Sequence, residues 1–145
     1  MPQNPKPRTH RIAAAEFHRK TRRDNAQETA EDYAEAISDL IAAKGSARSI
    51  DLAAHFGISP ATVAKTLVRL KRDGLVTSEP YRPIFLTPAG SALADASRAR
   101  HRLVTDFLRH LGVPAHIAEA DAEGIEHHAS AETLAAFRRL LASKH

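Results

Sequence analysis

The clearest apolar periodicity in the chain lies between residues 29 and 43. Apolar side chains recur there at i, i+3, i+4, i+7 and i+8, the spacing of one face of an α-helix. They are Tyr33, Ala36, Ile37, Leu40 and Ile41. Thr29 can cap the first turn of this helix, and Gly45 can stop it after Lys44. We therefore expect a helix from about Thr29 to Ala43.

A second pattern, over residues 46–74, predicts two short helices joined by a tight turn. The first helix covers 48–56 and ends at Gly57, and Ser59-Pro60 can open the second as N-cap and first helical residue. The residues expected to point inward are Ile50, Leu52, Ala53, Phe56, Val63, Leu67 and Leu70. The outward side of the second helix is small, polar or basic. This is the helix-turn-helix pattern, to which an ordinary helical hairpin is the alternative.

The helix-turn-helix is followed by a predicted β-hairpin. Two short apolar runs, 75–77 and 84–87, flank a turn over 78–83 that carries Arg82 near its tip. A helix-turn-helix with such a wing is a winged helix, and its expected partner is double-stranded DNA. The candidate DNA-binding residues are Ser59, Ala61, Thr62, Lys65, Thr66, Arg69 and Arg82.

The remaining residues predict three more helices. One runs from about Ser91 to His110, a break follows at 112–114, and Ser130 caps the last helix. Residues 103–145 are too few to form an independent core. Their apolar side chains therefore suggest packing against a second copy of the chain, as a homodimer. These side chains are Ile117, Ile125, Leu134, Phe137, Leu140 and Leu141.

The most informative stretch for chemistry is 121–128. In a helix, Glu123, Glu126 and His127 lie at i, i+3 and i+4, so two carboxylates and an imidazole share one face. No Lys or Arg occurs between Arg109 and Arg138 to offset the repulsion between the acids. A divalent cation would offset it, and oxygen with nitrogen ligands suits Mn, Fe or Zn. A solvated acidic face with an adjacent His is the alternative.

The charge is unevenly distributed along the 145 residues. Net charges are +5 for residues 1–27, −4 for 28–45, +5 for 46–102 and −2 for 103–145. Residues 1–27 are therefore expected to form a flexible basic arm, in which 12–23 could be a short helix. Its arginines and lysine, Arg19, Lys20, Arg22 and Arg23, either contact phosphates or are solvated. The absence of cysteine excludes disulfides and thiolate metal sites. No run approaches the ~20 apolar residues of a membrane span, so we expect a cytoplasmic protein without a membrane partner.

Three short motifs resemble those of the diphtheria toxin repressor family, in its short branch of manganese transport regulators. They are Asp-Tyr-Ala-Glu at 32–35, Arg-His at 100–101 and Glu-Gly-Ile-Glu-His-His at 123–128. With the helix-turn-helix between them, the resemblance covers residues 28–141. It implies a mainly α fold, in which a winged-helix DNA-binding domain with a small β-hairpin wing (28–98) precedes an all-α dimerisation and metal-binding domain (99–145).

The resemblance also implies a function and a ligand set. A pair of Mn(II) ions per subunit would be held by Asp32, Glu35, His101, Glu123, Glu126 and His127. Metal binding would couple the two domains, so that the homodimer binds its operator and represses manganese uptake genes when Mn(II) is bound. The alternatives are an iron-responsive or a metal-independent winged-helix regulator. A metal-dependent hydrolase is a remote alternative, because no nucleophile lies near the cluster. No small organic substrate is expected.

Overall fold

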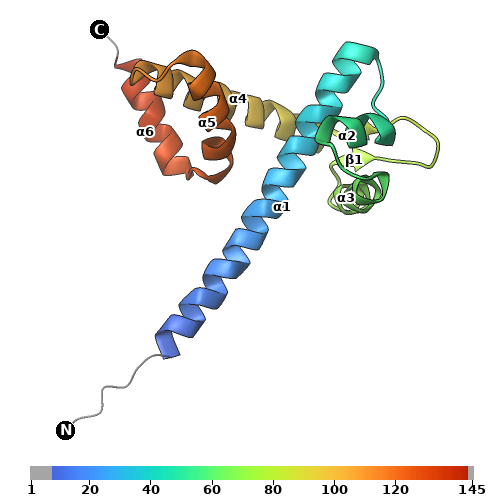
Figure 1. Ribbon diagram of the computed structural model, residues 1–145, viewed down its shortest axis with the longest axis horizontal. Helices are drawn as coiled ribbons and strands as arrows, with labels where there is room; N and C mark the ends of the chain where they lie inside the picture. The colour runs from blue at the N-terminus through green and yellow to red at the C-terminus, as the bar shows by residue number, and fades with distance from the viewer. Residues whose placement is uncertain (1–7, 144–145) are drawn as a thin grey trace.

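The structure, a computed structural model, describes residues 8–143 and is mainly helical, as predicted (Figure 1). Its elements, in order, are α1 (Arg8–Lys44), α2 (Ser49–Phe56), α3 (Pro60–Arg72), β1 (Val76–Thr77), β2 (Phe85–Leu86), α4 (Pro88–His110), α5 (Ala115–His128) and α6 (Ala131–Ala142). None of the described helices is both long enough and apolar enough to cross a membrane.

Helix α1 is much longer than the apolar pattern indicates. It begins at Arg8 and continues without interruption to Lys44, so the predicted start near Thr29 is wrong. Thr29 lies inside the helix, where its hydroxyl donates a hydrogen bond of 2.9 Å to the carbonyl of Asn25. The physical reason is that Gly and Pro are absent from 8–44, while Ala, Arg, Lys and Glu, all strong helix formers, are frequent. The blue half of α1 extends away from the other elements in Figure 1.

The predicted helix-turn-helix is present, with its core against the second half of α1. Tyr33 of α1 stacks on Phe56 of α2 with ring centroids 4.7 Å apart. Gly57 ends α2 with φ +65°, a left-handed conformation that glycine adopts without strain. Ser59 caps α3 by accepting a 3.2 Å hydrogen bond from the backbone N–H of Thr62. The other buried core residues are Ala30, Ala36, Ile37, Ala47, Leu52, Ala53, Val63, Leu67, Leu70, Val76 and Ile84.

Ile50 contradicts its predicted inward orientation, because it is 72% exposed. It occupies the first turn of the short helix α2, whose buried side is formed by Leu52 and Ala53. A helix of eight residues has too few apolar positions for their spacing to predict which face is buried.

The wing is a short antiparallel pair in which Val76 lies opposite Leu86. Both strands are shorter than predicted. Ile84 instead forms an isolated bridge with Ala47, which ties the hairpin to the segment before α2. Helix α4 begins at Pro88 rather than Ser91, because the Thr87 hydroxyl accepts the backbone N–H of Gly90 at 3.1 Å. A Cβ on Gly90 would lie 2.1 Å from the Leu75 carbonyl oxygen, so only glycine permits this close approach.

Helix α4 connects the winged-helix unit to the C-terminal helices α5 and α6 (Figure 1). Val104, Ala122 and Leu134 form a small buried cluster there, and Phe107 stacks on Phe137 with ring centroids 3.8 Å apart. Leu134 and Phe137 therefore pack within the chain, and the expectation that they face a second copy is wrong. Three helices, α1, α4 and α5, pack against one another where the predicted metal ligands lie.

Candidate metal centre and nucleic-acid interface

His127 lies where the DNA-binding unit (α1 to the wing) meets the C-terminal unit (the second half of α4 with α5 and α6). Its side chain is 2% exposed and extends from α5 towards the acidic part of α1. Nδ1 lies 2.5 Å from a carboxylate oxygen of Glu31, and Nε2 lies 3.3 Å from both Asp32 and Glu126. Hydrogen bonds with Asp32 and Glu31 raise the pKa of His127 to about 10, although burial opposes this shift. The ring is thus oriented by one carboxylate and presents its other nitrogen to two more.

Glu31 is itself buried, at 3% exposure, and its charge is compensated. Arg100 of α4 lies 2.7 Å from the Glu31 carboxylate, and Gln27 donates to it at 3.2 Å. Burial alone would raise the pKa of Glu31. The hydrogen bond with His127 and the charge of Arg100 outweigh burial and lower it. Glu31 therefore stays ionised and holds His127 Nδ1, the usual arrangement for a metal-ligating imidazole.

His101, on α4, faces a second group of carboxylates. Its Nε2 lies 2.8 Å from Glu119, and its Nδ1 lies 3.3 Å from Glu123 and 2.9 Å from Glu126. Burial opposes the charged ring, but the hydrogen bond with Glu119 and the charges of Glu126 and Glu123 raise the pKa of His101. All three acids are on α5, so this cluster lies within the C-terminal unit.

The acids around His127 and those around His101 form two clusters, named here after their histidines. Glu126 belongs to both clusters, with one oxygen towards each imidazole. Burial raises the pKa of Glu126 to about 7, and the neighbouring charges of Glu123 and Glu35 add to this effect, while the two histidines oppose it. Both of its oxygens, and Nδ1 of His101, are buried without a hydrogen-bond partner in the described part of the chain. Such orphaned acceptors are costly unless something else binds them, so the residues present fit a cation.

The structure brings the six predicted ligands into one region. Two groups have ligand atoms close enough to share an ion within residues 8–143: Glu28 with Asp32 and His127, and His101 with Glu123 and Glu126. Glu35 lies beside them, accepts a hydrogen bond from the buried Ser97 hydroxyl, and lines the same hollow as Asp32 and Glu123.

Sequence reasoning missed Glu28, Glu31 and Glu119. Glu28 lies one turn before Asp32 and Glu119 one turn before Glu123, so helical spacing could have indicated both. Glu28 also pairs with His128 at 3.2 Å. No local signal identifies Glu31, because its burial depends on Arg100 and His127, which are far away in sequence.

The predicted DNA-binding residues lie on α3 and the wing. Ala61, Thr62, Lys65 and Arg82 are exposed, and Thr66 is half-buried. Ser59 caps α3 through its side chain. Arg69 is half-buried and donates to the Ala26 carbonyl of α1 at 3.5 Å. Their contacts with DNA remain predictions.

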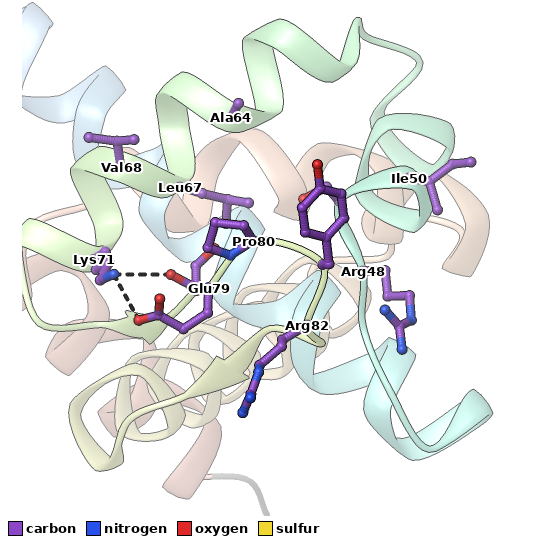
Figure 2. Close-up of a pocket in the computed structure, with 12 residues that line it drawn as sticks. Arg48, Ile50, Ala64, Leu67, Val68, Lys71, Glu79, Pro80 and Arg82 are labelled. Atoms are coloured by element: carbon purple, nitrogen blue, oxygen red, sulfur yellow. Dashed lines mark hydrogen bonds and ion pairs between the residues drawn. The ribbon is translucent and has the colours of Figure 1, made fainter.

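A groove of about 470 Å³ lies between α2, α3 and the wing, and Arg48, Val68 and Arg82 are among its lining residues (Figure 2). At one end, Lys71 of α3 contacts the Glu79 carboxylate at 3.2 Å and the Ser78 carbonyl at 3.1 Å. These contacts fix the position of the wing relative to α3. At the wing tip Tyr81 is fully exposed and has φ +65°, which is uncommon for a residue other than glycine.

Comparison with known proteins identifies the family. Residues 26–84 match the family model for the iron dependent repressor, N-terminal DNA binding domain, and residues 87–144 match that for the iron dependent repressor, metal binding and dimerisation domain. The chain belongs to the iron-dependent repressor family. This confirms the resemblance to the diphtheria toxin repressor family that the motifs indicate. The division at residue 98 stays a prediction.

Several members of the iron-dependent repressor family are similar over most of this chain. The transcriptional regulator MntR of Escherichia coli O6:H1 is 51% identical over 130 residues, which are 90% of this chain and 83% of the relative. The HTH-type transcriptional regulator MntR of Lysinibacillus sphaericus is 43% identical over 100 residues, 69% of this chain and 72% of that protein. The chain is accordingly a metal-dependent, DNA-binding transcriptional repressor and not an enzyme.

Solved structures of two manganese regulators share the fold. A manganese-dependent transcriptional repressor in complex with manganese superimposes with a TM-score of 0.67 at 28% identity, over 79% of this chain and 53% of that one. The manganese regulator SloR gives a TM-score of 0.66 at 26% identity, over 79% and 54%. The chain spans about half the length of these solved proteins.

Proposed function

We propose that this repressor responds to Mn(II), binds operator DNA as a homodimer, and represses manganese uptake genes when the metal is bound. The observation that carries the proposal is the position of Glu126 and His127. His127 of the C-terminal unit is buried beside Glu126, and the same ring nitrogen lies 3.3 Å from Asp32 of the DNA-binding unit. An ion held by all three would join the two units.

The chemistry of the ligands supports Mn(II). The two clusters offer carboxylate oxygens and imidazole nitrogens, the ligand types that suit Mn, Fe and Zn. Two clusters that share Glu126 fit two ions per subunit. The relatives include proteins named for manganese regulation, which favours Mn(II) within this set. Fe(II) is the second candidate, because the same oxygen and nitrogen ligands can hold it.

The proposed switch acts through the contact between α1 and α5. When bound, the metal would supply positive charge among Asp32, Glu123 and Glu126, whose mutual repulsion the single charge of a protonated His127 offsets only in part. Since α1 is continuous with the core that supports α3, fixing α1 against α5 fixes the recognition helix relative to the dimer. Recognition helices of a dimer must lie about 34 Å apart to enter successive major grooves. A link of this kind typically changes affinity by about 5- to 150-fold.

Exposed apolar side chains of the C-terminal unit support the homodimer. Leu111, Ile117, Ile125 and Leu140 are 59%, 42%, 37% and 43% exposed, respectively. Apolar side chains gathered on one small unit are typical of a subunit interface. The family model matched by this unit is described as a dimerisation domain.

A metal titration tests the proposal. A duplex selected by the protein from a random-sequence pool in Mn(II) is titrated with protein in Mn(II), Fe(II), Zn(II) or EDTA, and affinity is read by fluorescence anisotropy. We expect tightest binding in Mn(II) and weak binding in EDTA. His127→Ala should remove the metal dependence while circular dichroism and sedimentation show the wild-type fold and dimer. Equal affinity in Mn(II) and EDTA for the wild-type protein would refute the proposal.

A further inference from the structure

The N-terminal half of α1 carries a basic face whose role neither metal binding nor the family matches explain. Arg19, Arg22, Arg23 and Ala26 line one shallow hollow, so their side chains share one side of the helix. The three arginines, hereafter the arginine face, are all exposed. They form no ion pair with any of the described residues. The family match to the DNA-binding domain begins only at residue 26.

The arginine face is continuous with the recognition helix. Arg69 of α3 donates to the carbonyl of Ala26, so a side chain of α3 reaches α1 at the position where the arginine face ends. At 1.5 Å per residue, Arg19 lies only about 10 Å along α1 from Ala26. In Figure 1, α3 lies beside the middle of α1, and the blue half continues past it, away from α5 and α6.

We propose that the arginine face contacts phosphates of the same duplex that receives α3. This inference rests on the proposed operator binding and extends the DNA-contacting surface from α3 and the wing to α1. Phosphates border the major groove, which is about 12 Å wide, so arginines on a helix within side-chain reach of α3 lie near the groove edge. Arginine binds phosphate through charge-assisted, often bidentate hydrogen bonds. Such contacts are independent of base sequence.

Charge complementarity favours DNA over a second copy of the chain as the occupant. The acids in the second half of α1 already have partners within the chain, which are Glu28 with His128, Glu31 with Arg100, Asp32 with His127, Glu35 with Ser97 and Asp39 with Arg98. The other two acids of α1, Glu16 and Asp24, lie within the basic stretch itself. Two arginine faces brought together would repel. A polyanion provides the opposite charge along the whole face.

The experiment measures how operator affinity depends on salt. The triple variant Arg19→Gln, Arg22→Gln, Arg23→Gln keeps helix propensity, because Gln is a good helix former. A matched variant with the same charge change, Arg109→Gln, Arg138→Gln, Arg139→Gln, alters exposed arginines of the C-terminal unit. Each is titrated in Mn(II) against the selected duplex at about 50 to 200 mM salt, alongside the wild-type protein.

We expect the slope of log affinity against log salt to fall only in the arginine-face variant, by about 0.9 for each phosphate that the variant no longer neutralises. If each of the three arginines neutralises one phosphate, the wild-type protein should lose about 40-fold more affinity than the variant between 50 and 200 mM salt. An unchanged slope in the arginine-face variant, or an equal fall in both variants, overturns the inference.

A second measurement tests whether a second copy of the chain, rather than DNA, covers the arginine face. If sedimentation without DNA shows that the arginine-face variant is monomeric while the matched variant is dimeric, the face belongs to a subunit interface and the inference is overturned. Wild-type protein that shows no Mn(II)-dependent binding at any salt concentration would refute the proposed function itself. Mn(II)-dependent binding with an unchanged slope would refute only the role of the arginine face.

Discussion

The two imidazoles of the candidate metal centre have similar ligands and different surroundings. Each ring lies within 3.3 Å of three carboxylates. The ring of His127 is 2% exposed, and its partners come from both α1 and α5. The ring of His101 is 20% exposed, and its partners all lie on α5, with Glu119 and Glu123 more than half exposed.

Because of this difference, ions bound at the two clusters would have different effects on the arrangement of the two units. An ion near His101 would be held mainly by α4 and α5, with Glu35 as the candidate ligand from α1, so its main effect would be on the C-terminal unit. An ion near His127 would be held across the contact between α1 and α5. This second ion would therefore have the larger differential interaction with the two arrangements of the units, which coupling requires.

Asp32→Asn should have the largest effect, because it should break the metal-mediated link between α1 and α5. The substitution keeps the size of the side chain and removes the negative charge that α1 places beside Nε2 of His127, while Glu31 remains beside Nδ1. We expect the metal-dependent gain in operator affinity, about 5- to 150-fold for such a link, to disappear. At least one Mn(II) per subunit should still bind, because the His101 cluster is intact. Calorimetry and fluorescence anisotropy on the same variant measure the two quantities.

The matched control is Glu123→Gln, which removes a carboxylate from the His101 cluster instead. It should weaken Mn(II) binding and retain part of the metal-dependent gain. If Asp32→Asn and Glu123→Gln reduce the gain equally, the division of tasks between the two clusters is wrong.

The contrast also shows which parts of the site the sequence could predict. Glu123, Glu126 and His127 share one helical face at i, i+3 and i+4, so their proximity follows from local geometry. Their proximity to Asp32 does not, because it depends on how α1 packs on α5. The family resemblance supplied that pairing. The burial of Glu31 was not predictable, since it requires Arg100 from a helix about 70 positions away to compensate the charge.

For the fold, too, local features could be predicted from the sequence and contacts between distant segments could not. The helix-turn-helix was predictable because capping residues and Gly57 fix its turn locally. The start of α1 was missed because the apolar stripe ends where α1 leaves the core, while helix propensity carries the helix on to Arg8. Leu134 and Phe137 were assigned to a partner because their contacts with α4 cannot be read from spacing alone.

Glu31→Gln should have an intermediate effect on Mn(II) affinity, and it tests whether Glu31 positions the His127 ring. Gln can still form a hydrogen bond with Nδ1, but without charge, so the ring is held less firmly and is a weaker ligand. Loss of such a positioning residue typically costs about 10- to 100-fold in metal affinity. We expect a loss in this range by calorimetry with Mn(II). Glu132→Gln, which changes an exposed acid of α6, is the control and should bind Mn(II) as the wild-type protein does. Unchanged affinity in Glu31→Gln would show that Glu31 has no part in holding the ligand.

The pH dependence of Mn(II) binding tests the protonation of His127 and Glu126. A metal requires neutral His127 and ionised Glu126. Hydrogen bonds with Asp32 and Glu31 raise the pKa of His127 to about 10, so at neutral pH the ring carries a proton that the ion must displace. Affinity should therefore fall about tenfold for each unit by which pH decreases below 10. Burial raises the pKa of Glu126 to about 7, so below this pH a second proton competes and the fall should approach a hundredfold per unit.

Calorimetry in buffers of different ionisation enthalpy counts these protons directly. We expect about one proton released per subunit near pH 8, from His127, and a number that rises as pH falls, because Glu126 and His101 then also carry protons that the ions must displace. In Glu31→Gln the imidazolium loses a charged partner, so the pKa of His127 should be lower and fewer protons should be released near pH 8. This change separates the two imidazoles, because Glu31 lies against His127 and not among the partners of His101. Proton release near zero throughout would mean that the ion does not replace the proton of His127. The contact between α1 and α5 would then have to be switched by something other than metal binding at this ring.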